Sequence, residues 1–405
     1  MDKLKSYLLW VFRFSVIIYT LIAGYFFLTR TAGIGDEDLF ISNLALIQNI
    51  GWQAAIVEGI SIPYMLLSYL PAQIFEPHIA LRLVNVLLLL ALAGYFYYFR
   101  SIKKIDFYLM LLFFVSTVGY FYSGINDTLF IVSTVIFFSE TYVLAFKVEK
   151  GPLSFWVTAL ILMIFTRALA LIFVPVILIS IILVLRKGAF KRKTMLVPVL
   201  VFLGMLALNL PALQAHGGLS YDKKDPPQEV TVTWAQRQYL AQLMVNEGAL
   251  KNHNHPSWQQ TMDYVADYGE DALPKGILSG VFYDIPFTIK EFFKDFGDIL
   301  LYGSRQIGLV LPFMLFFGIK HFTKERRINQ STYIPLVLIT MMCIFALIII
   351  SYVELRWFGS VFIMAIYGFW KLHEEGKIAT VFLNVHYVLL TLMSSYGMYG
   401  IIKAI

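Results

Sequence analysis

Charged residues are scarce in this chain, and cysteine is almost absent. Asp, Glu, Lys and Arg together make up 14% of the 405 residues, whereas hydrophobic residues make up 59%. A water-soluble fold needs more polar surface than this composition supplies. The single cysteine, Cys343, lies in an apolar run, which excludes an internal disulfide and a cysteine-based metal site. The composition therefore favours an integral membrane protein over a soluble globular domain.

The sequence also lacks internal repeats, coiled-coil heptads and low-complexity tracts. The missing repeat counts against transporters that are built from inverted repeats. The net charge of +6 does not indicate nucleic acid, because the basic residues sit in short clusters between apolar runs rather than on one face. We therefore expect membrane lipids as partners, and no nucleic acid.

Long apolar runs fill most of the chain. A membrane-spanning helix needs about 20 apolar residues, so the length accommodates about eleven spans of an all-α polytopic protein. We expect these spans at 8–29, 79–99, 105–123, 128–146, 152–167, 168–185, 194–210, 306–322, 332–353, 357–371 and 378–401. The first run has no small-residue cleavage site after it, so we expect it to be a retained span rather than a signal peptide.

Basic residues orient these spans, because Lys and Arg collect in cytoplasmic loops. They cluster in every second connection, at Lys3/Lys5, Arg100/Lys103/Lys104, Lys147/Lys150, Arg186 to Lys193, Lys320 to Arg327 and Lys371/Lys377. This alternation predicts a cytoplasmic N-terminus and an outer C-terminus. For a prokaryotic chain, the expected location is the cytoplasmic membrane, with a site that faces the periplasm or the exterior.

Two outward segments are too long to be simple turns. Residues 31–77 are apolar but interrupted by polar residues, which predicts interfacial helices at 38–50 and 58–70 that flank a cavity. The second segment, 211–305, is the most hydrophilic part, with a helix expected at 233–247 and an interfacial helix at 282–296. The expected organisation is a transmembrane core in 1–210, an outward loop or small cap in 211–305, and C-terminal transmembrane helices in 306–405.

Ionisable residues near membrane depth are costly, so those at the ends of apolar runs are candidates for function. By the predicted topology they gather at the outer face, at Asp36-Glu37-Asp38, Arg82, Asp127, Arg167 and Glu354/Arg356. Carboxylates and guanidinium groups at the same depth can supply a general base and a phosphate clamp. The pattern favours a site at one face of the membrane that combines a base with a group that binds phosphate.

Several short motifs occur in a fixed order around these residues. They are Gly35-Asp-Glu-Asp, Gly51-Trp52, Ser61-Ile-Pro-Tyr64, Ala80-Leu-Arg82-Leu, Asn126-Asp127-Thr128, Thr166-Arg167-Ala168 and Leu355-Arg356-Trp357. The chain thereby resembles the GT-C superfamily of glycosyltransferases that use lipid-linked sugars, most closely protein O-mannosyltransferases and lipid A aminoarabinose transferases. The resemblance covers about the first 190 residues and the stretch around Arg356. Relatives often carry Thr-Lys-Gly in place of Thr166-Arg167-Ala168 and Arg-Tyr near Arg356, and the loop 211–305 matches no motif of the family.

The resemblance implies an inverting enzyme that moves a sugar from a polyprenyl phosphate to an acceptor glycan, lipid or protein. It implies Asp36 as the base and Arg167 and Arg356 as the groups that grip the donor phosphate. Substrate or cation positioning falls to Glu37, Arg82, Asp127, Glu354 and Tyr64. Arg82 could pair with an acid of the first loop, and Glu354 with Arg356. No cofactor is certain, and a divalent cation is left open.

Each candidate also has a purely structural interpretation. Asp36 and Asp127 could be N-caps of the helices that follow, and Arg167 could extend to the lipid headgroups. His216, His253 and His255 lack a regular zinc-ligand spacing, so we assign no metal. Two further functions stay open: a transporter or flippase of lipid-linked glycans, and a non-catalytic subunit of a membrane assembly.

The predicted topology can be tested with reporter fusions. Fusions at Lys150 and Ser257 should report opposite sides of the membrane, with Lys150 cytoplasmic, because the basic clusters alternate along the chain. A pair of enzymatic reporters, one active only inside and one only outside, measures this directly. Two fusions on the same side would overturn the topology.

Overall fold

The computed structural model describes residues 2–33, 35–146, 152–187, 195–222, 230–252 and 254–404. Every regular element in these ranges is a helix, which confirms the predicted all-α class. Contacts divide the chain into two compact units, each described separately below. Unit 1 comprises Met1–Asp222, Gly303–Leu338 and Arg356–Ile405, and unit 2 comprises Lys223–Tyr302 and Ile339–Leu355. The three-part division expected from the sequence differs from this one and stays a prediction.

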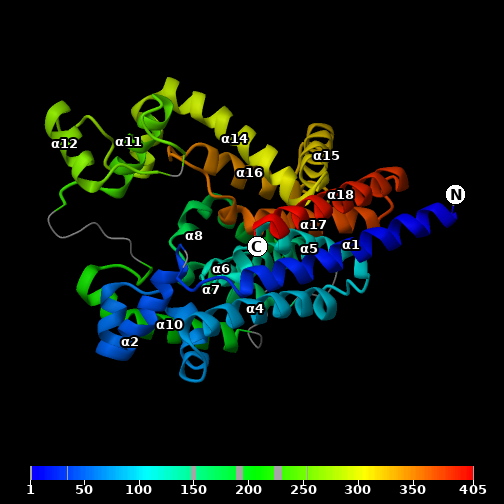
Figure 1. Ribbon diagram of the computed structural model, residues 1–405, viewed down its shortest axis with the longest axis horizontal. Helices are drawn as coiled ribbons and strands as arrows, with labels where there is room; N and C mark the ends of the chain where they lie inside the picture. Colours follow the sequence, from blue (N-terminus) through cyan, green and yellow to red (C-terminus); the bar gives the residue numbers. More distant parts are fainter. Residues whose placement is uncertain are drawn as a thin grey trace. The chain divides into compact units, whose positions relative to one another are not determined.

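Most helices belong to unit 1 (Figure 1). They are α1 (Asp2–Leu28), α2 (Glu37–Glu58), α3 (Ile62–Tyr69), η1 (Pro71–Gln73), α4 (Pro77–Phe99), α5 (Ile105–Val118), η2 (Tyr120–Tyr122), α6 (Asp127–Phe146), α7 (Leu153–Thr166), α8 (Leu169–Ile172), α9 (Val174–Leu185), α10 (Leu196–His216), α15 (Val310–Glu325), α17 (Gly359–Glu374) and α18 (Thr380–Ala404). Unit 2 holds α11 (Trp234–Asn246), α12 (Trp258–Tyr268) and α13 (Ile277–Tyr283). The division between the units falls within α14 (Ile285–Ile307), α16 (Tyr333–Ala346) and η4 (Leu355–Phe358).

Six of the described helices are long and apolar enough to cross a membrane. They are α1 from Ser6 onward, α2, α4, α6, α10 and α18. Four shorter apolar helices, α5, α7, α9 and α16, lie in other expected spans. Every expected span overlaps at least one helix, but the count of about eleven crossings stays a prediction. The cluster Lys147/Lys150 and part of the cluster from Arg186 to Lys193 lie outside the described residues.

The segment 31–77 folds differently from the prediction. Two separate helices form, as expected, and the second, α3, lies within 58–70. The first, α2, does not end near residue 50 but continues to Glu58 across a kink at Gly51, where φ is 82° and ψ is 165°. Gly59, with φ 99°, then ends α2, because a left-handed backbone favours glycine. The next helix, α3, starts at Ile62 and has a proline in its first turn. The expected break near residue 50 is therefore a kink, and α2 is itself long and apolar enough to span.

Helix α6 is the central element of unit 1. Almost all of its residues are buried, and it packs against α4, α7, α9 and α17. Its sequence is apolar on all sides, which is typical of a helix surrounded by other helices. The hydroxyls of Thr134 and Thr141 donate to carbonyls one turn earlier, at 2.7 and 2.8 Å, so these polar groups are satisfied within the helix. The first residue of this buried helix is Asp127.

Unit 2 confirms the helix expected at 233–247. Thr233 and Gln236 form a capping box at the start of α11, and Ser257 and Gln260 do the same at α12. The interfacial helix expected at 282–296 is instead the end of α13 followed by the longer α14. The break is at Asp284, whose carboxylate accepts the backbone N–H of Phe287 at 3.0 Å. A polar side chain that binds the backbone beyond it ends one helix and begins the next.

Candidate functional site

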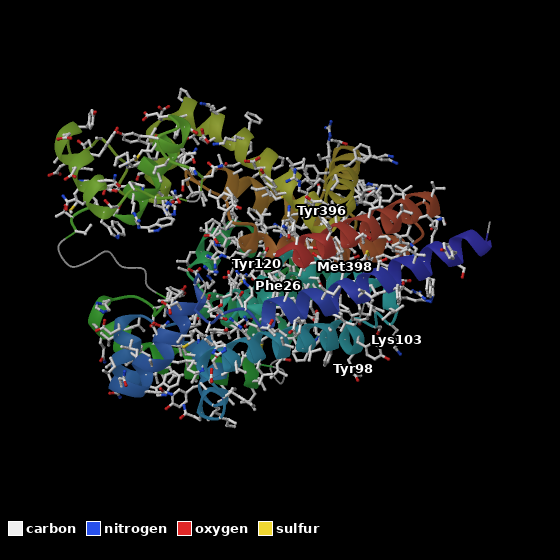
Figure 2. The ribbon with its side chains drawn as sticks, viewed as in Figure 1. Phe26, Tyr98, Lys103, Tyr120, Tyr396 and Met398 are labelled. Carbon is white, nitrogen blue, oxygen red and sulfur yellow. The ribbon has the colours of Figure 1, made fainter. Side chains whose placement is uncertain are left out.

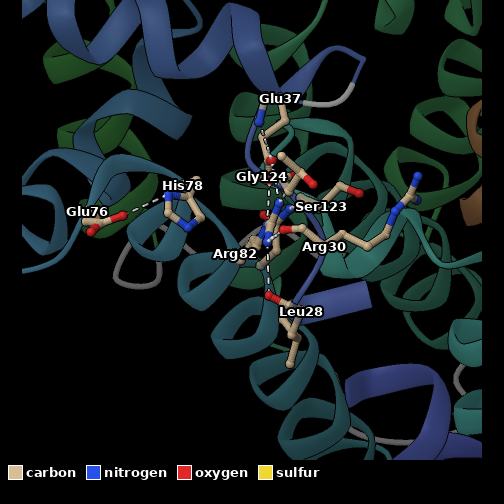
Figure 3. Close-up of polar contacts among 11 residues, drawn as sticks. Leu28, Arg30, Glu37, Glu76, His78, Arg82, Ser123 and Gly124 are labelled. Carbon is tan, nitrogen blue, oxygen red and sulfur yellow. Dashed lines mark hydrogen bonds and ion pairs between the residues drawn. The ribbon is translucent and has the colours of Figure 1, made fainter. Parts of the chain in front are cut away.

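The first acidic segment of unit 1 is fixed by an ion pair between Glu37 and Arg82. The guanidinium of Arg82 donates from Nε to Oε1 of Glu37 at 2.7 Å and from Nη2 to Oε2 at 2.6 Å. The backbone N–H groups of Gly33 and Gly124 donate to the same carboxylate at 3.1 and 2.8 Å (Figure 3). Both side chains are buried, so this contact is shielded from water and salt. The expected pairing of Arg82 with an acid of the first loop is confirmed.

Arg82 uses its remaining donors on the end of α1. Its Nη1 donates to the carbonyls of Leu28 and Arg30, and its Nη2 donates to the carbonyl of Thr31 (Figure 3). A guanidinium has five N–H groups, and these contacts together with Glu37 account for all five. The last carbonyls of a helix have no partner within it, so Arg82 satisfies them while holding the acidic segment in place. Arg82 and Glu37 therefore act as a structural brace.

A second set of charges lies beside this brace. Nη1 of Arg167 contacts Oδ1 of Asp127, and Nη1 of Arg356 contacts the other oxygen, Oδ2, at 3.3 Å. Nη2 of Arg356 also contacts Oδ2 of Asp36 at 2.5 Å. We call Asp36, Asp127, Arg167 and Arg356 the charge cluster. Four residues from four distant parts of the sequence thus form one continuous series of ion pairs.

Two of the structural interpretations, a capping role for Asp36 and a headgroup contact for Arg167, do not match the contacts of these side chains. Asp36 occupies the N-cap position of α2, but its side chain makes no capping hydrogen bond and binds Arg356 instead. Arg167 is 15% exposed and contacts Asp127, which differs from an arginine that extends to the headgroups. Charged side chains held together in the interior of a helical unit are a feature of functional sites in membrane proteins.

Another carboxylate, Asp222, lies beside the charge cluster, and sequence analysis did not single it out. Its Oδ1 accepts a hydrogen bond from Nδ2 of Asn126 at 3.1 Å, next to Asp127 in sequence. Burial raises the pKa of Asp222, although the positive charge of Arg167 and the Asn126 hydrogen bond act in the opposite direction. Asp222 follows α10 at the edge of a polar loop, where a lone aspartate is usually a solvated residue, so no local pattern distinguishes it.

Two other predicted residues, Tyr64 and Glu354, lie outside the charge cluster. Tyr64 is fully buried, packs edge-to-face on Phe40 and donates to the carbonyl of Leu81 at 3.4 Å, so it belongs to the packing of unit 1. Glu354 belongs to unit 2, whereas Arg356 belongs to unit 1. The contacts of Arg356 described above are with Asp36 and Asp127.

The histidines do not form a described metal centre. In unit 1, His216 contacts the carbonyl of Val57 at 3.0 Å, and in unit 2, His255 contacts the hydroxyl of Ser351 at 3.2 Å. His253 lies outside the described residues. Within the described ranges, no group of three or more His, Cys, Asp or Glu residues is arranged to hold a metal ion. The divalent cation left open by the sequence stays without a described site.

An apolar groove of about 380 Å³ lies between α4, α6 and α7 in unit 1. The groove is lined by leucines near the charge cluster, namely Leu88, Leu129 and Leu162. Farther along, it is lined by the aromatic side chains of Tyr98 and Phe155. Tyr98, close to the C-terminal end of α4, is 77% exposed (Figure 2). Leu129 is two residues after Asp127, and Leu162 is one turn before Thr166, so the groove extends along the helices that carry the charge cluster.

Comparison with known proteins finds no relative for this chain. No family model, no curated protein and no solved structure matches it. The candidate site therefore rests on its own geometry: a rigid brace, a cluster of alternating charges and an apolar groove along the same helices.

Neutralising Glu37 should destabilise the fold, whereas neutralising its neighbour Asp36 should not. Glu37→Gln leaves the buried Arg82 without its counter-charge, and breaking a buried pair costs about 3–5 kcal/mol. Asp36→Asn removes a more exposed contact, for which about 1 kcal/mol or less is expected. Thermal unfolding in detergent, followed by the loss of helical circular dichroism, measures both variants. Equal losses would show that Glu37 and Arg82 are not a brace.

Proposed function

We propose that this chain is a membrane glycosyltransferase. It moves a sugar from a polyprenyl-phosphate donor to an acceptor glycan, lipid or protein at the outer face of the membrane. The observation that supports this most is the position of Arg167 and Arg356, bridged by the one carboxylate of Asp127 at the start of α6. Two guanidinium groups held this close suit a phosphate, which accepts hydrogen bonds from several donors at once.

The apolar groove supports a lipid-linked donor. A prenyl chain loses about 0.8 kcal/mol for each CH₂ group that leaves an apolar environment, so the phosphate must be met at the depth of the headgroups. The groove between α4, α6 and α7 offers apolar walls along the two helices whose ends carry Asp127 and Arg167. The donor would then lie with its chain against these helices and its phosphate beside the guanidinium groups.

The charge cluster also provides what the reaction requires. The phosphate of the donor leaves with the electron pair of the bond to the sugar, and the two arginines stabilise the charge that develops on it. The hydroxyl or amine of the acceptor loses a proton, so a carboxylate must lie near the site to accept it. The resemblance in sequence assigns the role of this base to Asp36. Because the acceptor displaces the phosphate directly, the configuration at the anomeric carbon of the sugar is inverted.

A transporter of lipid-linked glycans is a second candidate, and a second buried ion pair favours it. Arg100 and Glu140 contact each other at 3.2 Å with fully buried side chains, and Tyr95 donates to Glu140 at 2.7 Å. Glu140 lies 13 residues after Asp127 on α6, about 20 Å along the helix. Charges at two depths are typical of transport pathways. Flipping of a fluorescent polyprenyl phosphate in proteoliposomes, without any sugar transfer, would favour this function.

Removing Arg167 should weaken the binding of a polyprenyl phosphate. Hydrogen bonds to charged groups contribute about 1.5–3 kcal/mol, so Arg167→Ala should raise Kd about 10- to 100-fold. Isothermal titration of the purified protein with a polyprenyl monophosphate measures this change.

Arg13→Ala is the matched control. Arg13 also pairs with an aspartate, Asp106, at 2.7 Å, but it belongs to the contact between α1 and α5 and not to the charge cluster. Its Kd should equal that of the wild type. Equal affinity for the wild type and Arg167→Ala would remove the phosphate clamp from the proposal.

A further inference from the structure

We propose that Asp222, rather than Asp36, accepts the proton of the acceptor hydroxyl or amine. This inference rests on the proposed function, because it names the base of the same reaction. It starts from the contacts of the three carboxylates in and beside the charge cluster. Asp36 and Asp127 form ion pairs with guanidinium groups, whereas Asp222 accepts a hydrogen bond from the neutral amide of Asn126.

Asp36 and Asp127 are poorly suited to take up a proton. Asp36 contacts Arg356 at 2.5 Å, and Asp127 contacts a guanidinium through each of its oxygens. An adjacent positive charge stabilises the ionised carboxylate and so weakens it as a base. Protonating either residue would also break the series of ion pairs that holds Arg167 and Arg356 in position. Their geometry favours a structural and phosphate-orienting role.

The two residues before Asp222, Ser220 and Tyr221, are each hydrogen-bonded to the core of unit 1. The Ser220 hydroxyl donates to the carbonyls of Ile56 and Ile60 at 2.8 and 2.9 Å. The Tyr221 hydroxyl donates to the carbonyl of Ile164 in α7 at 2.9 Å. These contacts join the segment to the end of α2 and to α7, one turn before Arg167. The position of Asp222 is therefore set by the core of unit 1.

Asn126 orients the Asp222 side chain. Its Nδ2 donates to Oδ1 of Asp222 at 3.1 Å and to the carbonyl of Thr166 at 3.4 Å, and the Ser61 hydroxyl also donates to that carbonyl at 2.9 Å. One amide thus connects Asp222 to the end of α7, directly before Arg167. A neutral amide donor orients a carboxylate without supplying the full counter-charge that a guanidinium brings to Asp36 and Asp127.

Burial, rather than the surrounding charges, leaves Asp222 better suited to bind a proton. Arg167 is the cation that acts on it and Asp36 is an anion that acts on it, while Arg356 and Asp127 complete the cluster. Burial is the largest effect and raises the pKa of Asp222 above its usual value. A base is most effective when its pKa approaches the working pH. Asp222 therefore combines a fixed position with a greater tendency to take up a proton.

The reaction step balances without any further reactant. The acceptor oxygen or nitrogen forms a bond to the anomeric carbon of the sugar, and the bond from that carbon to the phosphate oxygen breaks. The electron pair of the broken bond leaves with the polyprenyl phosphate, beside Arg167 and Arg356. The proton of the acceptor moves to the carboxylate of Asp222, which returns it to water after the products leave.

Proton uptake on phosphate binding tests this role without knowledge of the sugar. The full-length protein is titrated with a polyprenyl monophosphate in buffers of different ionisation enthalpy, which gives the number of protons bound per ligand. A bound phosphate adds negative charge near Asp222 and raises its affinity for a proton. The wild type should take up more protons per bound ligand than Asp222→Asn at neutral pH, and the difference should vanish at acidic pH, where Asp222 is already protonated.

One variant serves as the control. Asp267→Asn, which replaces an exposed aspartate of α12 in unit 2, should keep the proton uptake of the wild type. Binding with the same proton count in the wild type and Asp222→Asn would overturn the role of Asp222 while leaving the proposed function intact. Absence of any phosphate binding by the wild type would instead contradict the proposed function itself.

Discussion

The carboxylate of Asp127 is the group on which the candidate site depends. It is the first residue of α6, is almost completely buried, and contacts Arg167 with one oxygen and Arg356 with the other. Two guanidinium groups would repel each other strongly in a medium of low dielectric constant. A shared carboxylate removes this repulsion and fixes the distance between them. Asp127 therefore allows Arg167 and Arg356, which are 189 residues apart in sequence, to lie close together at one site.

Two neighbouring acids have different consequences for the fold. The Glu37 carboxylate accepts hydrogen bonds from four N–H groups and is 1% exposed. Through its ion pair with Arg82 of α4, it holds the C-terminal end of α1 against α4. Asp36 is one residue earlier, is more exposed and reaches Arg356. Because the brace fixes the backbone at residue 37, the position of Asp36 is fixed as well. A rigid structural pair thus holds a more accessible charge beside the cluster.

The sequence predicted the helices and part of the site. Apolar runs located α4, α6 and α18 well, since each run is long and its ends are marked by charge or glycine. The charged residues Asp36, Asp127, Arg167 and Arg356, which were expected to gather at one face, do contact one another, and the expected pairing of Arg82 with an acid is confirmed. Whether these residues carry out the proposed chemistry stays a prediction.

Other features were signalled only in part or not at all. Gly51 marked a break in the helix, but nothing in the local sequence showed that α2 continues beyond it. Residues 339–355 belong to unit 2, although their sequence is part of an apolar run that predicts a membrane span. Asp222 gave no pattern, because the position of the segment 220–222 is set by hydrogen bonds with residues 57 to 164 positions away in sequence. The difference between Glu37 and Asp36 likewise arises from contacts with Arg82 and Arg356 and not from the Asp-Glu-Asp motif.

A cryo-electron microscopy map of the protein with added polyprenyl monophosphate tests the central claim most directly. The account predicts phosphate density within hydrogen-bond distance of both Arg167 and Arg356, with the prenyl chain following the groove between α4, α6 and α7. Density for the phosphate at any other place, or a prenyl chain that avoids this groove, would contradict it.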